Sequence, residues 1–148
     1  MASVTAYLDT SVLVAASVKD HSHYVQASDL VAAIRAGTIR GCISTHGLAE
    51  LYSVLTRAPF NPRIHPADAG RILEDNILSC FELIALSVDD YKSVLRSCVG
   101  NGLIGAVVFD LLHLHAAQRA GCDRIYTFNV RDFRALAPKE MEDRIAAP

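Results

Sequence analysis

Short apolar runs alternate with longer amphipathic stretches along most of this chain, and no other feature constrains its fold so strongly. Short apolar runs are typical of strands, whereas apolar residues at helical spacing are typical of helices. Strands that alternate with helices indicate a parallel sheet covered by helices. The sequence therefore predicts an α/β fold with a central, mostly parallel sheet flanked by helices. We expect its strands at residues 4–8, 39–44, 81–87 and 124–127, with an edge strand near Arg144.

Capping and breaking residues mark where the helices begin and end. Hydroxyl and carboxylate side chains at Asp9-Thr10-Ser11 can cap a helix directly after the first strand. Ser87 and Asp90 have the spacing of a capping box at the start of a helix over residues 88–99. The stretch 103–120 is apolar nearly all round, so we expect a central, buried helix there. Further helices are expected from Ser22 to Gly37, from Ser44 to Arg57 and from Pro66 to Leu78, and a turn is expected over 129–133.

The size and charge of the chain limit what it can bind. Its 148 residues match the usual size of one domain, so we expect a single domain over residues 1–148. Apolar residues make up 51% and charged residues 20%, which excludes disorder and indicates a thick buried layer or a subunit interface. The formal charge of −2 provides no broad basic field. A polyanion such as nucleic acid must therefore be bound locally.

The cysteines and the N-terminus both favour the cytoplasm. The four cysteines form no CxxC pair and lie in apolar runs, which argues against zinc and is typical of buried thiols in a reducing compartment. The first apolar run has no Lys or Arg before it and stops at Asp9, unlike a signal peptide. No stretch approaches the roughly 18 apolar residues that a membrane helix needs. We expect a soluble cytoplasmic protein.

Three carboxylates occur where the surrounding sequence predicts burial. Asp9 follows the apolar pair Tyr7-Leu8, Glu50 lies among Leu48, Ala49 and Leu51, and Asp110 lies within the run 107–112. Burial of an unpaired carboxylate is costly, so each of these acids must find a cation, a hydrogen-bond donor or a proton. Taken singly, Asp9 could be a helix cap and Glu50 could face solvent.

The expected topology brings four acids together. Ligands of open α/β sheets bind beyond the carboxyl ends of the strands. Asp9 and Asp132 each follow a strand, and Glu50 lies in the second turn of a helix that follows one. Asp110 can reach the same edge from the N-terminal half of its helix. Converging carboxylates repel one another, and a hard divalent cation such as Mg²⁺ or Mn²⁺ would neutralise them. Such an ion can activate water, so we expect hydrolytic phosphoryl transfer.

Other polar residues near these acids have weaker signals. His113 falls on the same side of its helix as Asp110, but we interpret His113, His115 and the pair His21-x-His23 as structural, the last as helix capping. Asp132 alone could complement a helix dipole. Three residues are expected to support the ligands through hydrogen bonds, namely Thr10, Thr127 and Asn129. Candidate phosphate contacts are Arg57, Arg63, Arg71 and Arg131.

Four motifs in order resemble the PIN domain. They are Tyr7-Leu-Asp9-Thr-Ser-Val-Leu13, the Glu50 helix, Gly105-Ala-Val-Val-Phe-Asp110-Leu-Leu-His113 and Tyr126-Thr-Phe-Asn129-Val-Arg-Asp132-Phe133. Among PIN proteins, the chain length and the ending Thr127-x-Asn129-x-x-Asp132-Phe133 look most like VapC, the ribonuclease toxin of type II toxin–antitoxin modules. The resemblance implies an endoribonuclease dependent on Mg²⁺ or Mn²⁺, a homodimer, and inhibition by an antitoxin.

The resemblance also implies roles for the acids. Asp9 and Asp110 would be the principal metal ligands, and Glu50 and Asp132 would complete the catalytic quartet. Some PIN domains carry an acid where this chain has Asn129, so the fourth ligand is open between Asn129 and Asp132.

Alternative functions make different demands on the sequence. A phosphate-accepting receiver domain needs a Lys near its phosphate, and no Lys follows a late strand here. An aspartyl phosphatase would need a second acid two residues after Asp9, where this chain has Ser11. A PIN nuclease that processes RNA without an antitoxin stays open, as does a PIN-fold binding protein without turnover.

Overall fold

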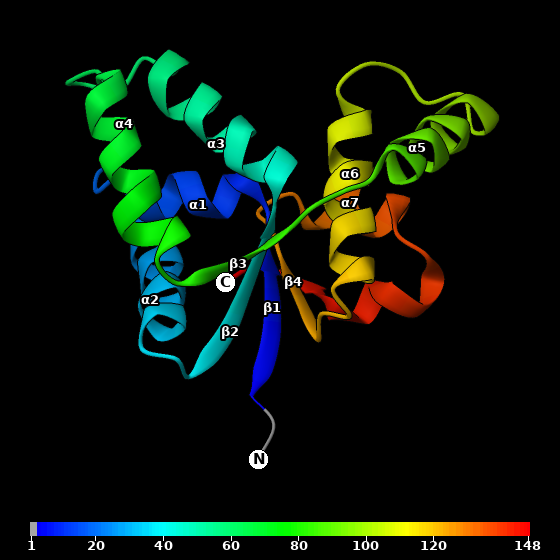
Figure 1. Cartoon of the computed structure of the whole chain (residues 1–148), viewed down its shortest axis with the longest axis horizontal. Coiled ribbons are helices and arrows are strands. Elements are labelled where there is room, and N and C mark those ends of the chain that lie inside the picture. Colours follow the sequence, from blue (N-terminus) through cyan, green and yellow to red (C-terminus); the bar gives the residue numbers. More distant parts are fainter. Residues whose placement is uncertain (1–2) are drawn as a thin grey trace.

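The computed structural model describes residues 3–148 and contains one sheet of five strands (Figure 1). The strand order is β3-β2-β1-β4-β5, and all four neighbouring pairs are parallel. The expected α/β fold is confirmed, with a sheet that is wholly rather than mostly parallel. The strands are β1 (Val4–Leu8), β2 (Ile39–Ser44), β3 (Phe81–Ile84), β4 (Arg124–Tyr126) and β5 (Ile145–Ala146).

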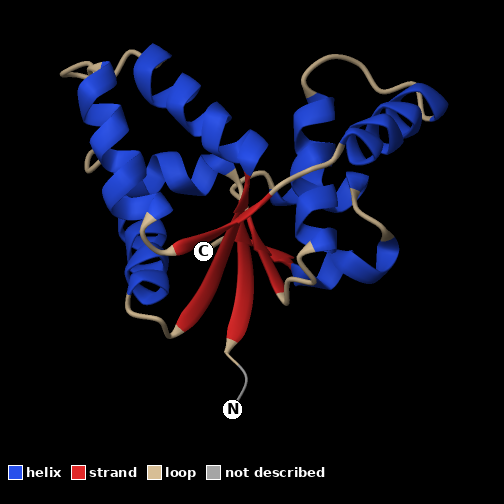
Figure 2. Cartoon of the chain, viewed as in Figure 1, coloured by secondary structure: helices blue, strands red, loops and turns tan. Residues whose placement is uncertain are grey.

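Helices cover both faces of the sheet, in two groups that Figures 1 and 2 place on opposite sides. The first group is α1 (Thr10–Ser17), α2 (Tyr24–Arg35), α3 (Thr45–Arg57) and α4 (Pro66–Ile72), which continues as the π-helical turn η1 (Leu73–Leu78). The second group is α5 (Val88–Gly100), α6 (Val107–Arg119), α7 (Val130–Leu136) and the 3₁₀ segment η2 (Lys139–Arg144).

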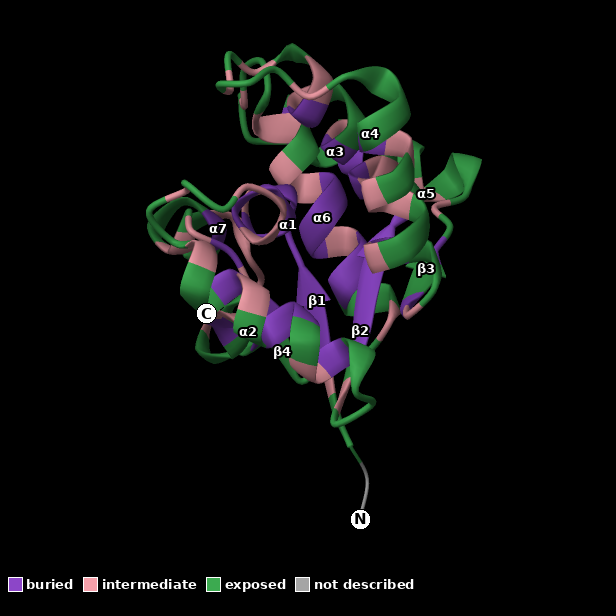
Figure 3. Cartoon of the chain, turned by 90° about the vertical axis from the view of Figure 1, so that its left-hand side faces the viewer, coloured by how far each residue is buried: buried purple, intermediate pink, exposed green. Residues whose placement is uncertain are grey.

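Strand β1 is buried on both faces because its side chains alternate between two cores. Ala6 and Leu8 pack with α1, α2 and α3, whereas Tyr7 packs with α6 and α7. Figure 3 shows buried residues concentrated along the central strands and α6. A strand that is buried on both faces is typical of a parallel sheet with helices on each side. The carboxyl end of β1 is thereby fixed at the centre of the molecule.

Helix α6 begins later than the sequence predicts. Gly102 and Gly105 have φ angles of +63° and +70°, which no right-handed helix accommodates, so α6 starts at Val107 rather than Leu103. The expectation of a wholly buried helix is also wrong, since the Phe109 side chain is 44% exposed. The first turn of α6 is therefore available to a site at the edge of the sheet.

Other boundaries differ from the expected ones. A helix, α7, forms where a turn was expected, because Phe133 is fully buried against the second core and anchors this segment. Strand β3 ends at Ile84 rather than Ser87, and α2 begins at Tyr24 rather than Ser22. The expected capping box of α5 is present between Ser87 and Asp90. The caps and apolar runs thus located most elements but not α7 or η2, and tertiary contacts set the ends of the others.

Two further properties of the described residues concern membrane-spanning helices and cysteine thiols. No helix in residues 3–148 has both the length and the apolar character needed to cross a membrane. All four cysteines have free thiols, and Cys42, Cys98 and Cys122 are buried.

Candidate active site

A pocket of about 310 Å³ opens at the carboxyl ends of β1 and β4, beside α3 and α6. Three carboxylates reach it from separate elements: Asp9 from the end of β1, Glu50 from α3 and Asp110 from α6. No Lys or Arg is among the residues of the described chain that line it, which are Asp9, Thr10, Ser11, Val14, His21, His23, Glu50, Val54, Asp110, Phe128 and Asn129. The pocket therefore concentrates negative charge without a basic side chain to offset it.

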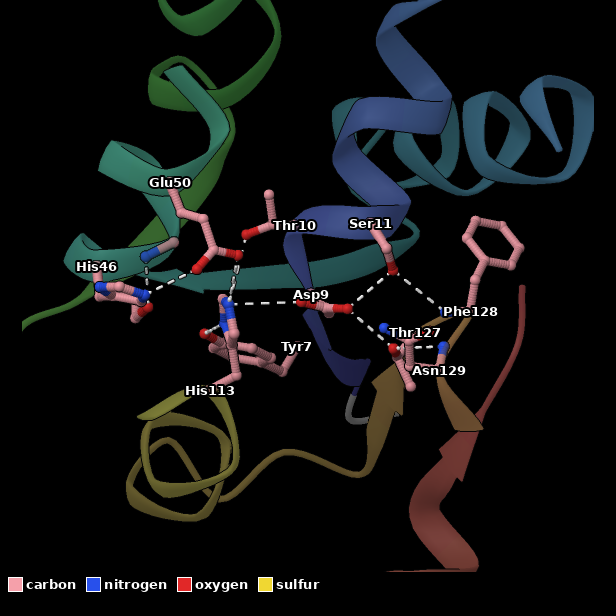
Figure 4. A network of polar contacts seen from close by, with 12 residues as sticks. Tyr7, Asp9, Thr10, Ser11, His46, Glu50, His113, Thr127, Phe128 and Asn129 are labelled. Carbon is pink, nitrogen blue, oxygen red and sulfur yellow. Dashed lines mark hydrogen bonds and ion pairs between the residues drawn. The ribbon is translucent and has the colours of Figure 1, made fainter. Parts of the chain in front are cut away.

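Asp9 is held by hydrogen bonds between β1 and α1. Its Oδ2 atom accepts hydrogen bonds from the hydroxyls of Ser11 at 2.8 Å and Thr127 at 2.9 Å (Figure 4). Its Oδ1 atom faces His113 Nε2 at 3.4 Å. Asp9 occupies the N-cap position of α1, but its side chain makes no capping hydrogen bond, so capping does not account for the carboxylate. The carboxylate is 4% exposed and directed into the site.

Glu50 is clamped between two histidines. Its Oε2 lies 2.9 Å from His46 Nε2, one helical turn earlier, and its Oε1 lies 3.3 Å from His113 Nε2. Burial disfavours the charged carboxylate, but hydrogen bonds from His113, His46 and Thr10 outweigh burial and hold the pKa of Glu50 well below its usual range. Glu50 is therefore a fixed, permanently charged group at neutral pH.

His113 lies at the centre of the network and is 1% exposed. Its Nε2 faces two carboxylates, which can only accept hydrogen bonds, so this nitrogen carries a proton. Its Nδ1 pairs with the Tyr7 hydroxyl at 2.7 Å. Burial lowers the pKa of His113, but the hydrogen bond to Glu50 and the charges of Asp9 and Glu50 outweigh it and raise that pKa. His113 thus fixes two acids of the site, beyond the purely structural role expected for it.

Asp110 lies in the first turn of α6 and differs from the other two acids. Burial raises the pKa of its carboxyl most, and the negative charges of Asp9, Glu50 and Asp132 raise it further, to about 6. The charge of His113 offsets this shift only in part. Asp110 is thus a carboxylate whose negative charge is not matched by the protein itself.

The remaining expected residues lie around these acids. Thr127 is fully buried, donates to Asp9, and its hydroxyl accepts from the Asn129 backbone N–H at 3.0 Å. Thr10 Oγ1 lies 3.4 Å from His113 Nε2, and Asn129 lines the pocket. Asp132 is exposed in the first turn of α7 and does not line the pocket, although its charge acts on Asp110. The structure thus brings three of the four predicted acids to one pocket.

Sequence reasoning missed three residues that organise this pocket. Tyr7, Ser11 and His46 each bind a residue of the site directly. The position of His46, four residues before Glu50 on one helix face, was a readable signal. The role of Ser11 could not be recognised in the sequence because it depends on a distant segment. The Ser11 hydroxyl also accepts a hydrogen bond from the Phe128 backbone N–H at 3.2 Å.

Two sets of side chains could hold a metal ion. Ligand atoms of His46, Glu50 and His113 lie within 4.8 Å of one another, but these atoms already satisfy each other through hydrogen bonds. Asp9 and Asp110 have carboxylate oxygens at the pocket, and the raised pKa of Asp110 indicates a site that lacks positive charge. Oxygen ligands suit Mg²⁺ and Mn²⁺. The carboxylates fit a divalent cation better than the histidine cluster does.

The family model described as PIN domain matches residues 6–138. The chain belongs to the PIN domain family. It is 30% identical to Ribonuclease VapC40 of Mycobacterium tuberculosis over 132 residues, which cover 89% of this chain and 90% of that protein. This membership confirms the family and the ribonuclease class predicted from the sequence, and it excludes the receiver and phosphatase alternatives.

Two solved structures have the same fold. VapC20 of M. tuberculosis, a toxin that cleaves the sarcin-ricin loop, superposes with a TM-score of 0.70 at 16% identity, covering 90% of this chain and 97% of VapC20. VapBC2 of Rickettsia felis, bound to a DNA fragment from its promoter, superposes with a TM-score of 0.62 at 23% identity and covers 89% of this chain and 92% of that one. At these identities the likeness concerns the fold alone.

Proposed function

We propose that this protein is a divalent-metal-dependent endoribonuclease that hydrolyses RNA phosphodiesters, and that it is the toxin of a type II toxin–antitoxin pair. The observation that carries the proposal is the convergence of Asp9, Glu50 and Asp110 in one pocket of a PIN fold. The identity with Ribonuclease VapC40, spread over nine-tenths of both chains, supports the toxin.

Mg²⁺ or Mn²⁺ fits this pocket, and we assign Asp9 and Asp110 as its principal ligands, with Glu50 and Asp132 completing the acidic quartet. The donor set favours such an ion because it consists of carboxylates without a neighbouring Lys or Arg among the lining residues. When bound, a divalent cation stabilises charge on the phosphate oxygens and lowers the pKa of water, which supplies the nucleophile.

The side chains divide the remaining work. Glu50 is held as a charged acceptor by His46 and His113, so it can orient a water molecule through a hydrogen bond. Ser11 and Thr127 fix one oxygen of Asp9, which leaves the other directed toward the site. The pKa of Asp110 is raised to about 6 by burial and by the neighbouring carboxylates, so this group is ionised above that pH and can bind the cation as a carboxylate.

The proposed partners follow from charge and exposed apolar area. An antitoxin that inserts an Arg into this acidic pocket would bind carboxylates bidentately and displace the metal. A homodimer is supported by an apolar stripe on α5, where Val88, Leu95 and Val99 are 71%, 52% and 84% exposed at helical spacing. Four free thiols fit a cytoplasmic location, which we also propose.

Cleavage assays on single-stranded and structured RNA test the nuclease. We expect cleavage that requires Mg²⁺ or Mn²⁺, stops in EDTA, and leaves a 5′-phosphate. Undiminished cleavage in EDTA would overturn the metal mechanism, and a 2′,3′-cyclic phosphate would indicate attack by the ribose hydroxyl instead.

Co-expression separates the toxin from an RNA-processing nuclease. Expression of the chain alone should arrest growth, and co-expression with the product of a small neighbouring gene should restore growth and yield a complex. An active nuclease that is harmless alone and copurifies with no small partner would favour RNA processing.

A further inference from the structure

Three aromatic rings form a stack at the rim of the acidic pocket. The rings of His23 and Phe128 lie nearly parallel, with centroids 4.4 Å apart and an interplanar angle of 16°. The ring of His21 lies 6.5 Å from Phe128 at an angle of 28°. All three residues line the same pocket as Asp9 and Asp110. A flat aromatic surface therefore lies beside the carboxylates without taking part in their hydrogen-bond network.

The stack is attached rigidly to the proposed metal ligand. The Phe128 backbone N–H donates to Ser11 Oγ at 3.2 Å, and this same hydroxyl donates to Asp9 at 2.8 Å (Figure 4). Phe128 also packs against the first core. A ligand on the stack is thereby held at a constant position relative to Asp9.

A hydrogen bond in the turn before α2 explains His21, whereas no capping bond explains His23. The Nδ1 atom of His21 accepts from the His23 backbone N–H at 3.1 Å, which stabilises the turn before α2. His23 occupies the N-cap position of α2, yet its side chain makes no capping hydrogen bond and is exposed. The sequence interpretation of both histidines as caps is therefore wrong for His23, whose ring contacts Phe128 instead.

A second pocket of about 380 Å³ adjoins the first and shares His21 with it. Its exposed lining is mainly apolar, with Val18, Phe60 and Ile64 among its residues, and the opposite charges of Lys19 and Asp20 both lie on it. An apolar hollow without net charge suits the flat face of a base.

We infer that His23 and Phe128 form a platform on which an unpaired RNA base stacks, with the adjoining pocket receiving a neighbouring nucleotide. Proteins recognise unpaired bases in RNA by stacking them on aromatic side chains, and a paired base has no free face to offer. The platform selects single-stranded segments or loops and sets which phosphate lies over Asp9. This inference rests on the proposed ribonuclease function and names the part of the substrate that the site recognises.

Binding of a single-stranded oligoribonucleotide that carries 2-aminopurine tests the platform. The full-length Asp110→Asn variant is the parent, so that binding is measured without cleavage, by anisotropy and by quenching of 2-aminopurine on stacking. Adding His23→Ala should weaken binding about 5- to 100-fold, the range for loss of one stacked base, and should abolish the quenching. His23→Phe should restore both signals because it restores a ring.

Matched variants separate stacking from other effects. Tyr52→Ala removes an exposed aromatic on α3 that lines neither pocket, and it should leave binding unchanged. Phe128→Leu, checked for folding by thermal melting, should weaken binding as His23→Ala does. The inference is overturned if His23→Ala binds as tightly as the parent, or if His23→Lys restores binding and His23→Phe does not, which would indicate a charge contact.

The single variant His23→Ala, assayed for cleavage with Mg²⁺ and with EDTA, tests the proposed nuclease separately. Cleavage should still depend on the metal even if the platform does not bind a base.

Discussion

The two halves of the acidic pocket satisfy their charges in opposite ways. In the half formed by α3 and His113, each oxygen of Glu50 faces a histidine nitrogen, and the pKa of Glu50 is depressed. In the half formed by the first turn of α6, Asp110 faces other carboxylates, and its pKa is raised to about 6. The same type of side chain is thus a charge paired with histidines in one half and an unneutralised charge in the other.

This difference indicates which half depends on a ligand. Histidine contacts stabilise the Glu50 half in the protein alone, whereas the proposed cation would stabilise the Asp110 half. Removing a group should therefore damage the first half mainly through folding and the second mainly through activity.

The largest expected effect is the loss of activity in Asp110→Asn. We predict that RNA cleavage falls about 100- to 10,000-fold, because one ligand carboxylate of the proposed metal is lost. The metal-free protein should be at least as stable as the wild type, since repulsion with Asp9 and Glu50 is relieved at nearly constant shape. Initial rates of cleavage and thermal melts in EDTA measure the two effects.

Asp29→Asn is the control for this variant, because Asp29 is exposed in the middle of α2 and does not line the pocket. It should change neither activity nor melting temperature. A large loss of stability in Asp110→Asn would show that Asp110 is a structural partner and that the two halves do not differ as described.

The next effect concerns the histidine half. His113→Phe leaves the Tyr7 hydroxyl and Glu50 without their buried partner, so we predict a loss of about 2–4 kcal/mol in the free energy of unfolding. Urea titration measures this loss. His115→Phe is the matched control, since His115 lies on the same helix but pairs with Asp90 near the surface, and it should cost clearly less. Equal losses would mean that the buried network adds little.

Much of the fold could be predicted from the sequence. Apolar runs located β1, β2 and β4, and a capping box located the start of α5, because these signals are local. The start of α6 was missed because positive φ at Gly105 is not distinguishable in sequence from a tolerated helical glycine. Helix α7 was missed because it forms around the buried Phe133, a tertiary contact.

The site was predictable where acids interrupt apolar sequence and not where partners come from distant segments. Asp9, Glu50 and Asp110 were recognisable because burial of a carboxylate demands a reason. His113 could be placed on the face of Asp110, but its contacts with Tyr7 and Glu50 join residues that are 106 and 63 positions apart. The aromatic stack depends in the same way on Phe128, which meets His23 only in the folded chain.

A smaller effect is the pH dependence of stability in the metal-free protein. The pKa of Asp110 is raised from 3.8 to about 6, so the folded state holds a proton that the unfolded state has lost between these values. Stability should fall as pH rises from about 4 to about 6 and then level off. The contribution is of order 1 kcal/mol because Asp110 is partly exposed to solvent. Thermal melts of the wild type and of Asp110→Asn in EDTA, repeated across this pH range, give the contribution of Asp110 as the difference in stability. If the stability of both proteins depends on pH in the same way, the prediction is contradicted.

The smallest expected effect tests whether the half of the pocket that contains Asp110 also includes Asp132. Asp132 is exposed and outside the pocket lining, and its negative charge is the weakest of those that raise the pKa of Asp110. An exposed charge contributes about 1 kcal/mol or less, so Asp132→Asn should reduce cleavage by roughly fivefold or less, and salt should screen this difference. Rates at low and high ionic strength measure both points, with Asn129→Ala as the counterpart that lines the pocket. If Asp132→Asn instead abolishes cleavage at every ionic strength, Asp132 binds the metal directly. The Asp110 half of the pocket would then extend onto α7, and Asp132 rather than Asn129 would be the fourth ligand.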